Sequence, residues 1–246
     1  MRPVLLLIPG MNNTPKVWEP VRACLRSDVE VRVTDVRSSA DIPSMAVRAW
    51  KDLADIEPSR PLALAGFSMG GYVALHMIAT APRPVQALAM VCSSARPDDP
   101  ASAPMRERAI AAAQRDWERY ITGIANYLTT PHAQSDSALM ETIRADLREA
   151  GMAPTIAQHR AVAARPDHRS MLPSLRLSAL VIAGALDPLI PPAQSREIAD
   201  AVPGARWLEV AGVGHLLPWE QPATLAHAID EWLEPLTCAT SNPQET

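Results

Sequence analysis

Apolar segments of strand length recur in the N-terminal part of the chain and again after residue 170. They are Val4–Ile8, Pro61–Ala65, Val85–Cys92, Ala179–Ala183 and Arg206–Val210. Short runs without a polar face, such as Val4–Ile8, are typical of parallel strands buried on both faces. Val29–Thr34 alternates between apolar and polar residues instead, which predicts a strand with one solvated face. We expect this strand at a sheet edge, where the charged Glu30 and Arg32 would hinder pairing with another chain.

Segments with helical character lie between these strands. They are Trp18–Leu25, Pro43–Ile56, Gly71–Ala81, Pro191–Ala201 and Pro222–Leu233. An alternation of strands and helices indicates a parallel sheet with helices on both faces. The pattern therefore predicts the α/β class.

The alternation stops between Pro97 and Ser170, where Ala, Arg, Glu and Met dominate and no strand-like run occurs. Three or four helices separated by Pro131, Gly151 and Pro154 are expected there. Their expected ranges are Met105–Gln114, Trp117–Leu128, Ser137–Ala150 and Thr155–Ala164. We therefore predict a core of residues 1–96 and 171–234, interrupted by a helical cap of residues 97–170. Residues 235–246 are expected to form a disordered tail.

The composition excludes several classes of function. The 246 residues are 48% apolar and 20% charged, and the formal net charge of −4 offers nothing that attracts a nucleic acid backbone. Cys24, Cys92 and Cys238 are odd in number and widely separated, which argues against a disulfide framework and against a zinc site. Val4–Ile8 is too short for a signal sequence or a membrane span. We expect a cytoplasmic monomer or homodimer without nucleic acid or membrane partners.

Gly66-Phe67-Ser68-Met69-Gly70 lies between an expected strand and an expected helix. A serine in a tight strand-to-helix turn with glycines two positions to either side has the pattern of a nucleophile elbow. The glycines are needed because the serine backbone is strained and a Cβ on either neighbour would crowd the turn. Ser68 Oγ is thereby expected in the open at the carboxyl end of a strand, near a helix N-terminus.

An acid and a base also follow predicted strands. Asp187 comes after Ala179–Ala183, and His215 comes after Arg206–Val210. Because the carboxyl ends of parallel strands share one edge of the sheet, we expect Ser68, Asp187 and His215 on the same side. A serine nucleophile needs a base to take its proton and an acid to hold that base in the right tautomer. The sequence therefore predicts a catalytic triad.

The order serine, aspartate, histidine is that of the α/β-hydrolases, and the chain resembles the members with a helical cap, a group of esterases, lactonases and C–C hydrolases. The resemblance rests on Ile8-Pro9-Gly10, Gly66–Gly70, Arg165-Pro166-Asp167, Gly184–Pro188 and the stretch from Gly214 to Pro222. It implies an α/β-hydrolase fold with about six strands. It also implies a serine hydrolase that cleaves a small carboxylic ester or lactone through an acyl-enzyme, without a metal or an organic cofactor.

The resemblance further implies an oxyanion hole formed by the backbone N–H groups of Met11 and Met69. Pro9-Gly10 departs from the His-Gly of many relatives, but the expected donor is a backbone group and is retained. The antiparallel pair of strands that opens the fold in the family is missing, which leaves Val29–Val36 as the outermost strand.

Other residues have competing interpretations. Asp98 and Asp99 also follow a strand, where some relatives place the acid, but solvated loop carboxylates are the simpler explanation. Ser93 and Ser94 lack an elbow, and His76 is read as a packing histidine. The remaining histidines, which show no metal-ligand spacing, are His132, His159, His168 and His227.

An apolar stripe at helical spacing runs through the expected cap helix that begins at Trp117. It either packs the cap onto the body or lines a pocket for the acyl or alcohol part of a substrate. The residues expected to line such a pocket are Met105, Trp117, Tyr120, Tyr127 and Trp219. Thioester, C–C bond or cyanohydrin cleavage and a receptor that keeps the triad remain open alternatives. Haloalkane and epoxide chemistry is disfavoured, because the relatives with that chemistry carry Asp at the position of Ser68.

Overall fold

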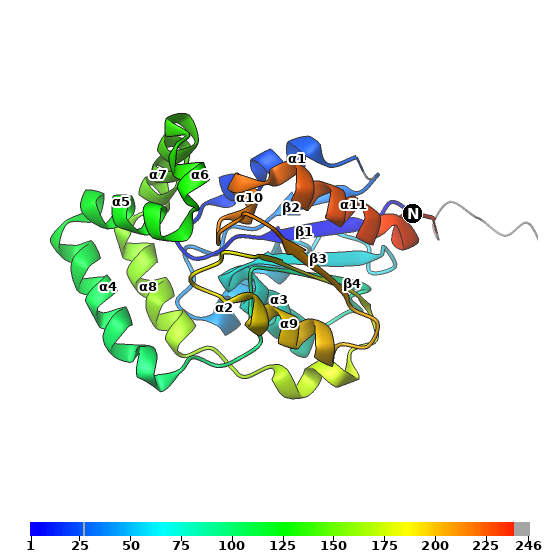
Figure 1. The fold of residues 1–246 in the computed structure, drawn as a ribbon. Coiled ribbons are helices and arrows are strands. Elements are labelled where there is room, and N and C mark those ends of the chain that lie inside the picture. Colours follow the sequence, from blue (N-terminus) through cyan, green and yellow to red (C-terminus); the bar gives the residue numbers. More distant parts are fainter. Residues whose placement is uncertain (27, 239–246) are drawn as a thin grey trace, which may run out of the picture.

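The computed structural model describes residues 1–26 and 28–238. In this part of the chain, six parallel strands form one sheet in the order β2-β1-β3-β4-β5-β6 (Figure 1). The strands are β1 (Val4–Ile8), β2 (Glu30–Val33), β3 (Leu62–Phe67), β4 (Ala87–Val91), β5 (Ser178–Gly184) and β6 (Arg206–Val210). The predicted α/β class and the edge position of the alternating strand are confirmed.

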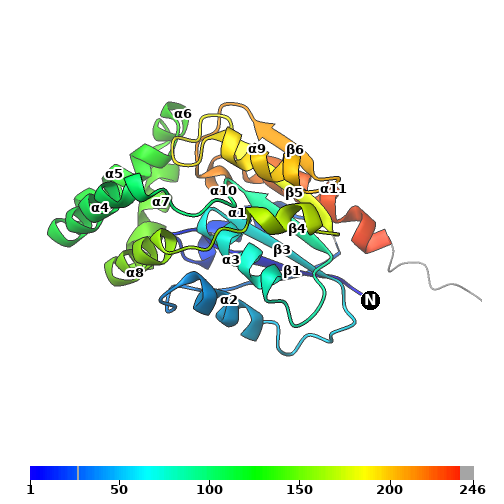
Figure 2. The same ribbon diagram turned by 90° about the horizontal axis from the view of Figure 1, so that it is seen from below.

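Helices cover both faces of the sheet (Figures 1 and 2). On one face lie α1 (Glu19–Cys24) and α11 (Pro222–Cys238), and on the other α2 (Ile42–Lys51), α3 (Met69–Ala79) and α9 (Pro192–Ala201). Leu5 and Leu7 of β1 pack in the core on the α11 side, whereas Leu6 and Ile8 pack in the core on the α3 side. The central strands are apolar throughout because both of their faces are buried.

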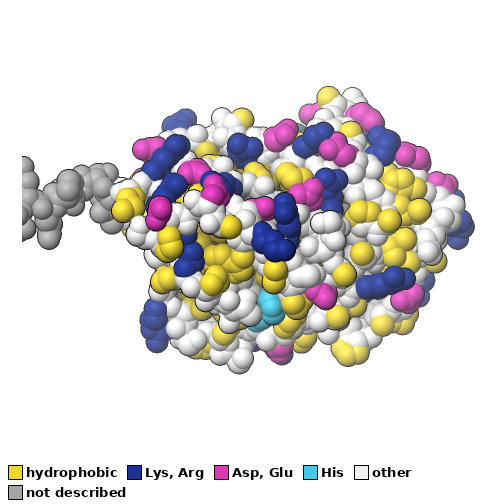
Figure 3. All heavy atoms as spheres, turned by 180° about the vertical axis from the view of Figure 1, so that it is seen from behind, with side chains coloured by type: hydrophobic (Ala, Val, Ile, Leu, Met, Phe, Trp, Pro, Cys, Tyr) yellow, Lys and Arg dark blue, Asp and Glu magenta, His cyan; other side chains and the backbone are white. Residues whose placement is uncertain are grey.

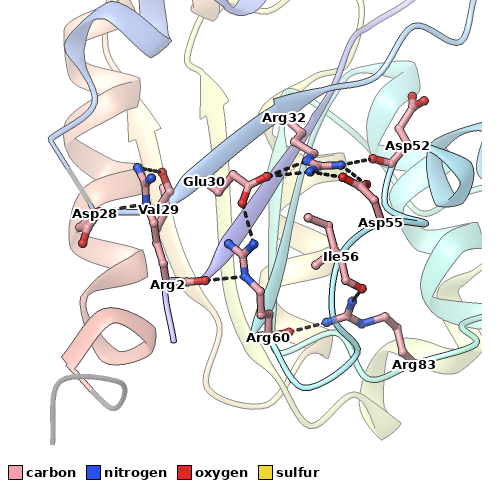
Figure 4. Close-up of polar contacts among 10 residues, drawn as sticks. All are labelled: Arg2, Asp28, Val29, Glu30, Arg32, Asp52, Asp55, Ile56, Arg60 and Arg83. Atoms are coloured by element: carbon pink, nitrogen blue, oxygen red, sulfur yellow. Dashed lines mark hydrogen bonds and ion pairs between the residues drawn. The ribbon is translucent and has the colours of Figure 1, made fainter.

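Charged side chains cover the β2 edge of the sheet, as Figure 4 shows. Arg32 Nε donates to Glu30 Oε1 at 2.9 Å, and the Arg32 guanidinium also pairs with Asp55. Arg60 Nη1 donates to the other Glu30 oxygen at 2.6 Å. Partly exposed ion pairs contribute little to stability, so their role here is to keep the unpaired edge of β2 polar, as expected from the sequence.

The helices between β4 and β5 lie together at one end of the sheet (Figure 1). They are α4 (Ala103–Arg115), α5 (Trp117–Leu128), α6 (Pro131–Gln134), α7 (Ser137–Ala150) and α8 (Met152–Ala163). Gly151, with φ of 87°, separates α7 from α8 as predicted. Pro131 is the first residue of α6 and lies between α5 and α7, as predicted. Pro154 does not interrupt a helix, because it lies in the first turn of α8, where a missing N–H leaves no bond unmade.

The last helix is longer than predicted. It continues through Pro235 to Cys238, and Leu236 is buried against the core. The prediction of a disordered tail is therefore wrong for residues 235–238, because burial of Leu236 favours continuing the helix. Residues 239–246 lie outside the described part of the chain.

The surface in Figure 3 carries interspersed basic and acidic side chains and no extended patch of one sign. In the described part of the chain, no helix combines the length and the apolar character needed to cross a bilayer. Among the same residues, no group of His, Cys, Asp or Glu side chains is arranged to hold a metal ion.

Candidate active site

Ser68 occupies a strained turn between β3 and α3. Its φ of 52° and ψ of −117° lie in a region that non-glycine residues rarely adopt. A Cβ on Gly66 would lie 2.3 Å from the carbonyl oxygen of Gly70, and a Cβ on Gly70 would lie 2.2 Å from that of Ile8. The two glycines are therefore required by close backbone contacts, as the motif predicts. The serine is held at the carboxyl end of a central strand.

The structure brings Ser68, Asp187 and His215 together. His215 Nε2 lies 2.9 Å from Ser68 Oγ, and His215 Nδ1 lies 2.7 Å from Asp187 Oδ2. All three residues are buried. If Nδ1–H donates to Asp187, Nε2 is left unprotonated and accepts the proton of the serine hydroxyl.

The loops after β5 and β6 hold the acid and the base. Asp187 Oδ1 accepts hydrogen bonds from the backbone N–H groups of Leu189 and Ile190, both at 2.9 Å, which leaves Oδ2 for His215. A Cβ on Gly184 would lie 2.1 Å from the carbonyl oxygen of Gly214, so the two loops meet only because glycine stands at the end of β5. The strand-end placement of both residues follows the sequence pattern.

The cap touches the base directly. The backbone N–H of His215 donates to the carbonyl oxygen of Leu128 at the end of α5, at 2.9 Å. Glu220 bridges the same two segments, because Oε1 accepts from the Gly214 N–H and Oε2 accepts from the Thr130 hydroxyl. Burial raises the pKa of Glu220, and these hydrogen bonds oppose that rise. Glu220 lies in the stretch that carries the family resemblance, but no spacing rule marked it as a bridge.

The alternative acids are engaged elsewhere. Asp98 pairs with Arg106 and Arg165 at 2.5 and 2.8 Å. Burial alone would raise the pKa of Asp98, but the two arginines outweigh it and hold the pKa below its usual range. Asp99 caps a short 3-10 helix through the Ala101 N–H.

Ser93 supports the elbow, which the sequence did not indicate. Its Oγ donates to the carbonyl oxygen of Ser68 at 2.8 Å, and its own carbonyl oxygen accepts from Ser195 Oγ at 2.7 Å. Gly71 is required beside it, because a Cβ there would lie 2.2 Å from Ser93 Oγ. No local motif reveals this contact, since it joins the ends of β3 and β4 with α9.

The backbone N–H groups of Met11 and Met69 are available for an oxyanion. Met69 is the first residue of α3, so its N–H has no partner inside the helix. Among the described residues, neither N–H donates to a protein acceptor. Met11 lines the same cavity as Ser68. The arrangement suits two donors beside the serine.

Ser68 opens onto a largely apolar cavity of about 400 Å³ beneath the cap. Of the residues expected to line a pocket, Met105, Tyr120 and Tyr127 do so. The expectation for Trp117 is corrected, because it does not line the cavity and instead stacks on Tyr120, with ring centroids 5.4 Å apart. The expectation for Trp219 is corrected, because its side chain packs into the core and borders a separate hollow beside α7.

A second cavity of about 210 Å³ adjoins Ser68 on the side of α3 and α4. Charged side chains line much of it, including the Asp98, Arg106 and Arg165 cluster. Arg165 also lies over the ring of Tyr72, 4.6 Å from its centroid. The serine thus stands between an apolar space and a polar one.

The chain is similar in sequence and in fold to a known family of proteins. The model of the alpha/beta hydrolase family matches residues 5–228. A pimeloyl-[acyl-carrier protein] methyl ester esterase of Xanthomonas oryzae is 34% identical over 229 residues, which cover 87% of this chain and 88% of that protein. The bifunctional biotin biosynthesis protein BioHC of Cellvibrio japonicus is 26% identical, and the chain spans about half of its length, 49%.

Among solved structures, a thermophilic esterase from Thermogutta terrifontis with malate bound is 27% identical. It superposes with a TM-score of 0.87, over 96% of this chain and 91% of that one. The family model covers the elbow, both loops of the site and the whole cap. The chain belongs to the alpha/beta hydrolase family.

Proposed function

We propose that the protein is a serine hydrolase that cleaves a small carboxylic ester or lactone. The observation that carries the proposal is the pair of contacts from His215 to Ser68 Oγ and Asp187 Oδ2, at 2.9 and 2.7 Å, beside a largely apolar cavity. The esterases among its relatives and structural neighbours support the ester as substrate class. The free thiols Cys24 and Cys92 support a cytoplasmic location.

In the proposed mechanism, Ser68 Oγ attacks the carbonyl carbon while His215 Nε2 takes the hydroxyl proton. Asp187 keeps the imidazole oriented and stabilises its charged form. The Met11 and Met69 N–H groups stabilise the negative oxygen of the tetrahedral intermediate. His215 then protonates the leaving alcohol, and a water molecule hydrolyses the acyl-enzyme by the same route in reverse.

The test is multiple turnover on p-nitrophenyl esters of increasing chain length, together with small lactones. We expect many equivalents of product per protein, and a loss of kcat of about 10⁴-fold or more in Ser68→Ala with an unchanged melting temperature. Release of one equivalent or less from every ester and lactone would instead identify a receptor that retains the three residues.

A further inference from the structure

The loop after β1 is packed against the elbow on one side. A Cβ on Gly10 would lie 2.9 Å from the ring of Phe67, and a Cβ on Gly70 would lie 2.2 and 2.7 Å from the carbonyl oxygens of Ile8 and Pro9. Asn12 adopts a positive φ of 64°, which asparagine tolerates better than most residues. The body therefore fixes the inner side of the segment that carries the Met11 N–H.

The cap holds the outer side of the same loop through three successive residues. The Asn12 N–H donates to Gln158 Oε1 of α8 at 2.9 Å. Asn13 Nδ2 donates to Asp146 Oδ2 of α7 at 3.0 Å, and Thr14 donates to Asp146 Oδ1 from its N–H at 3.2 Å and its hydroxyl at 2.5 Å. These contacts begin one residue after Met11.

Burying the carboxylate of Asp146 costs free energy that an apolar packing residue would not cost. Its side chain is buried, with 3% of the residue exposed, and among the described residues no Lys or Arg forms an ion pair with it. Burial raises the pKa of its carboxyl, and the hydrogen bonds from Thr14 and Asn13 oppose that rise. A buried carboxylate that is hydrogen-bonded only by neutral donors stabilises the fold less than a well-packed apolar side chain at the same position would. What it provides is three directional bonds to one loop.

We propose that Asp146, assisted by Gln158, is a positioning residue that holds the β1 loop so that the Met11 N–H points at the developing oxyanion. The proposal deepens the proposed function and rests on it, since it needs Met11 as an oxyanion donor. The cap then does more than shape the substrate cavity. The body contacts one side of the β1 loop, and the cap fixes its other side and with it part of the catalytic geometry.

The experiment compares Asp146→Asn with Glu149→Gln. Glu149 lies on the same helix and pairs with Lys16 of the same loop region at 2.5 Å, but both side chains are about half exposed. The control therefore breaks a contact between the same two segments without touching Asn12, Asn13 or Thr14. Thr14→Val removes the hydroxyl that donates to Asp146 and accepts from the Lys16 N–H, and Thr14→Ser restores both contacts.

Two readouts separate positioning from packing. Asp146→Asn loses the charged acceptor of Asn13 Nδ2 and turns an NH₂ group toward it, and Thr14→Val loses the hydroxyl donor to Asp146. In ester hydrolysis, both variants should lower kcat by about 10- to 100-fold and change KM by less than about threefold, because the Met11 N–H that the loop positions acts in the transition state. Glu149→Gln should leave both constants unchanged, and Thr14→Ser should regain most of the kcat that Thr14→Val loses. The second readout is the rate at which a fluorophosphonate labels Ser68, followed by intact mass.

The labelling reaction needs the nucleophile and the oxyanion donors but no ester turnover. Asp146→Asn should slow it in parallel with kcat, measured well below the melting temperature. An Asp146→Asn protein that melts earlier but keeps kcat and the labelling rate within twofold would overturn the proposal. If Asp146→Asn does not fold, the Thr14 pair decides by the same criterion. A wild-type protein that turns over no ester, yet is labelled more slowly after Asp146→Asn, would refute the proposed function and retain the positioning role.

Discussion

The body and the cap contribute to one site by different physical means. The body supplies Ser68, Asp187 and His215 from the carboxyl ends of three parallel strands, where topology alone brings them together. The cap supplies walls such as Tyr120 and polar contacts such as Asp146, and these depend on how five helices dock. Catalytic residues at strand ends can be recognised in the sequence because each follows a strand. Residues that line the cavity only after the cap helices dock have almost no such pattern.

The β1 loop is where the two regions meet. It follows a body strand and packs on the elbow, yet Asn12, Asn13 and Thr14 are bonded to cap helices. Pairing a substitution in one region with a matched substitution in the other therefore separates what each region contributes to the site.

Asp187→Asn should lower kcat by about 10³- to 10⁴-fold. The amide oxygen can keep accepting from the Leu189 and Ile190 N–H groups, which turns the NH₂ group toward His215 Nδ1. That arrangement favours the tautomer with the proton on Nε2, so the imidazole cannot take the Ser68 proton. Single-turnover kinetics on an activated ester would measure the loss.

Asp98→Asn is the matched change at the junction with the cap. It weakens two arginine contacts and is expected to lower the melting temperature while kcat falls by less than about tenfold. Near-full activity in Asp187→Asn together with an inactive but folded Asp98→Asn would show that the acid had been assigned to the wrong residue.

The sequence predicted the body well and the cap only in outline. The strands Val4–Ile8 and Arg206–Val210 match their predicted bounds, because buried parallel strands and turn glycines leave strong local signals. The existence of a helical insertion was also predictable. Trp219 could not be placed, since it is apolar and lies near the base in sequence. Only the packing of its own short helix, α10 (Leu217–Glu220), beside α7 decides that it faces the core.

The polar contacts of the cap escaped prediction for a related reason. Asp146 and Gln158 look like ordinary helix-surface residues until the helices dock onto the β1 loop. Ser93 and Glu220 also gain their partners only in the folded chain. The triad could be predicted because each of its residues follows a strand, but Asp146, Gln158, Ser93 and Glu220 carry no such local signal, so the sequence does not reveal their long-range hydrogen bonds.

The cap should also lose stability at mildly acidic pH through His159. Burial, with a smaller contribution from Arg106, lowers the pKa of His159 to about 4, from the 6.5 expected in the unfolded chain. Between pH 6.5 and 4 the unfolded chain therefore binds more protons than the folded chain. The contribution of neutral His159 to stability is complete above pH 6.5 and is lost as the pH falls toward 4. From pH 7.5 to 5 the loss should be about 2 kcal/mol.

His159→Gln supplies the comparison, because a glutamine can form a hydrogen bond with the Tyr120 hydroxyl but does not titrate. Urea unfolding at both pH values should show a smaller fall in the free energy of unfolding for the variant than for the wild type. If the free energy of unfolding falls equally in the two proteins, His159 becomes protonated in the folded cap by pH 5 just as it does in the unfolded chain.

The smallest effect is expected at the rim of the cavity. Tyr127 lines the cavity from α5, is 51% exposed, and donates from its hydroxyl to the carbonyl oxygen of Pro188, next to Asp187. Tyr127→Ala should widen the cavity and shift the ratio of kcat/KM between long-chain and short-chain esters toward the longer ones, by about three- to tenfold. Tyr127→Phe keeps the ring and loses only the contact with Pro188, so its ratio should match the wild type. A Phe variant that shifts the ratio as far as the Ala variant would show that Tyr127 acts through the acid loop of the body and that the wall of the cap is not what selects the substrate.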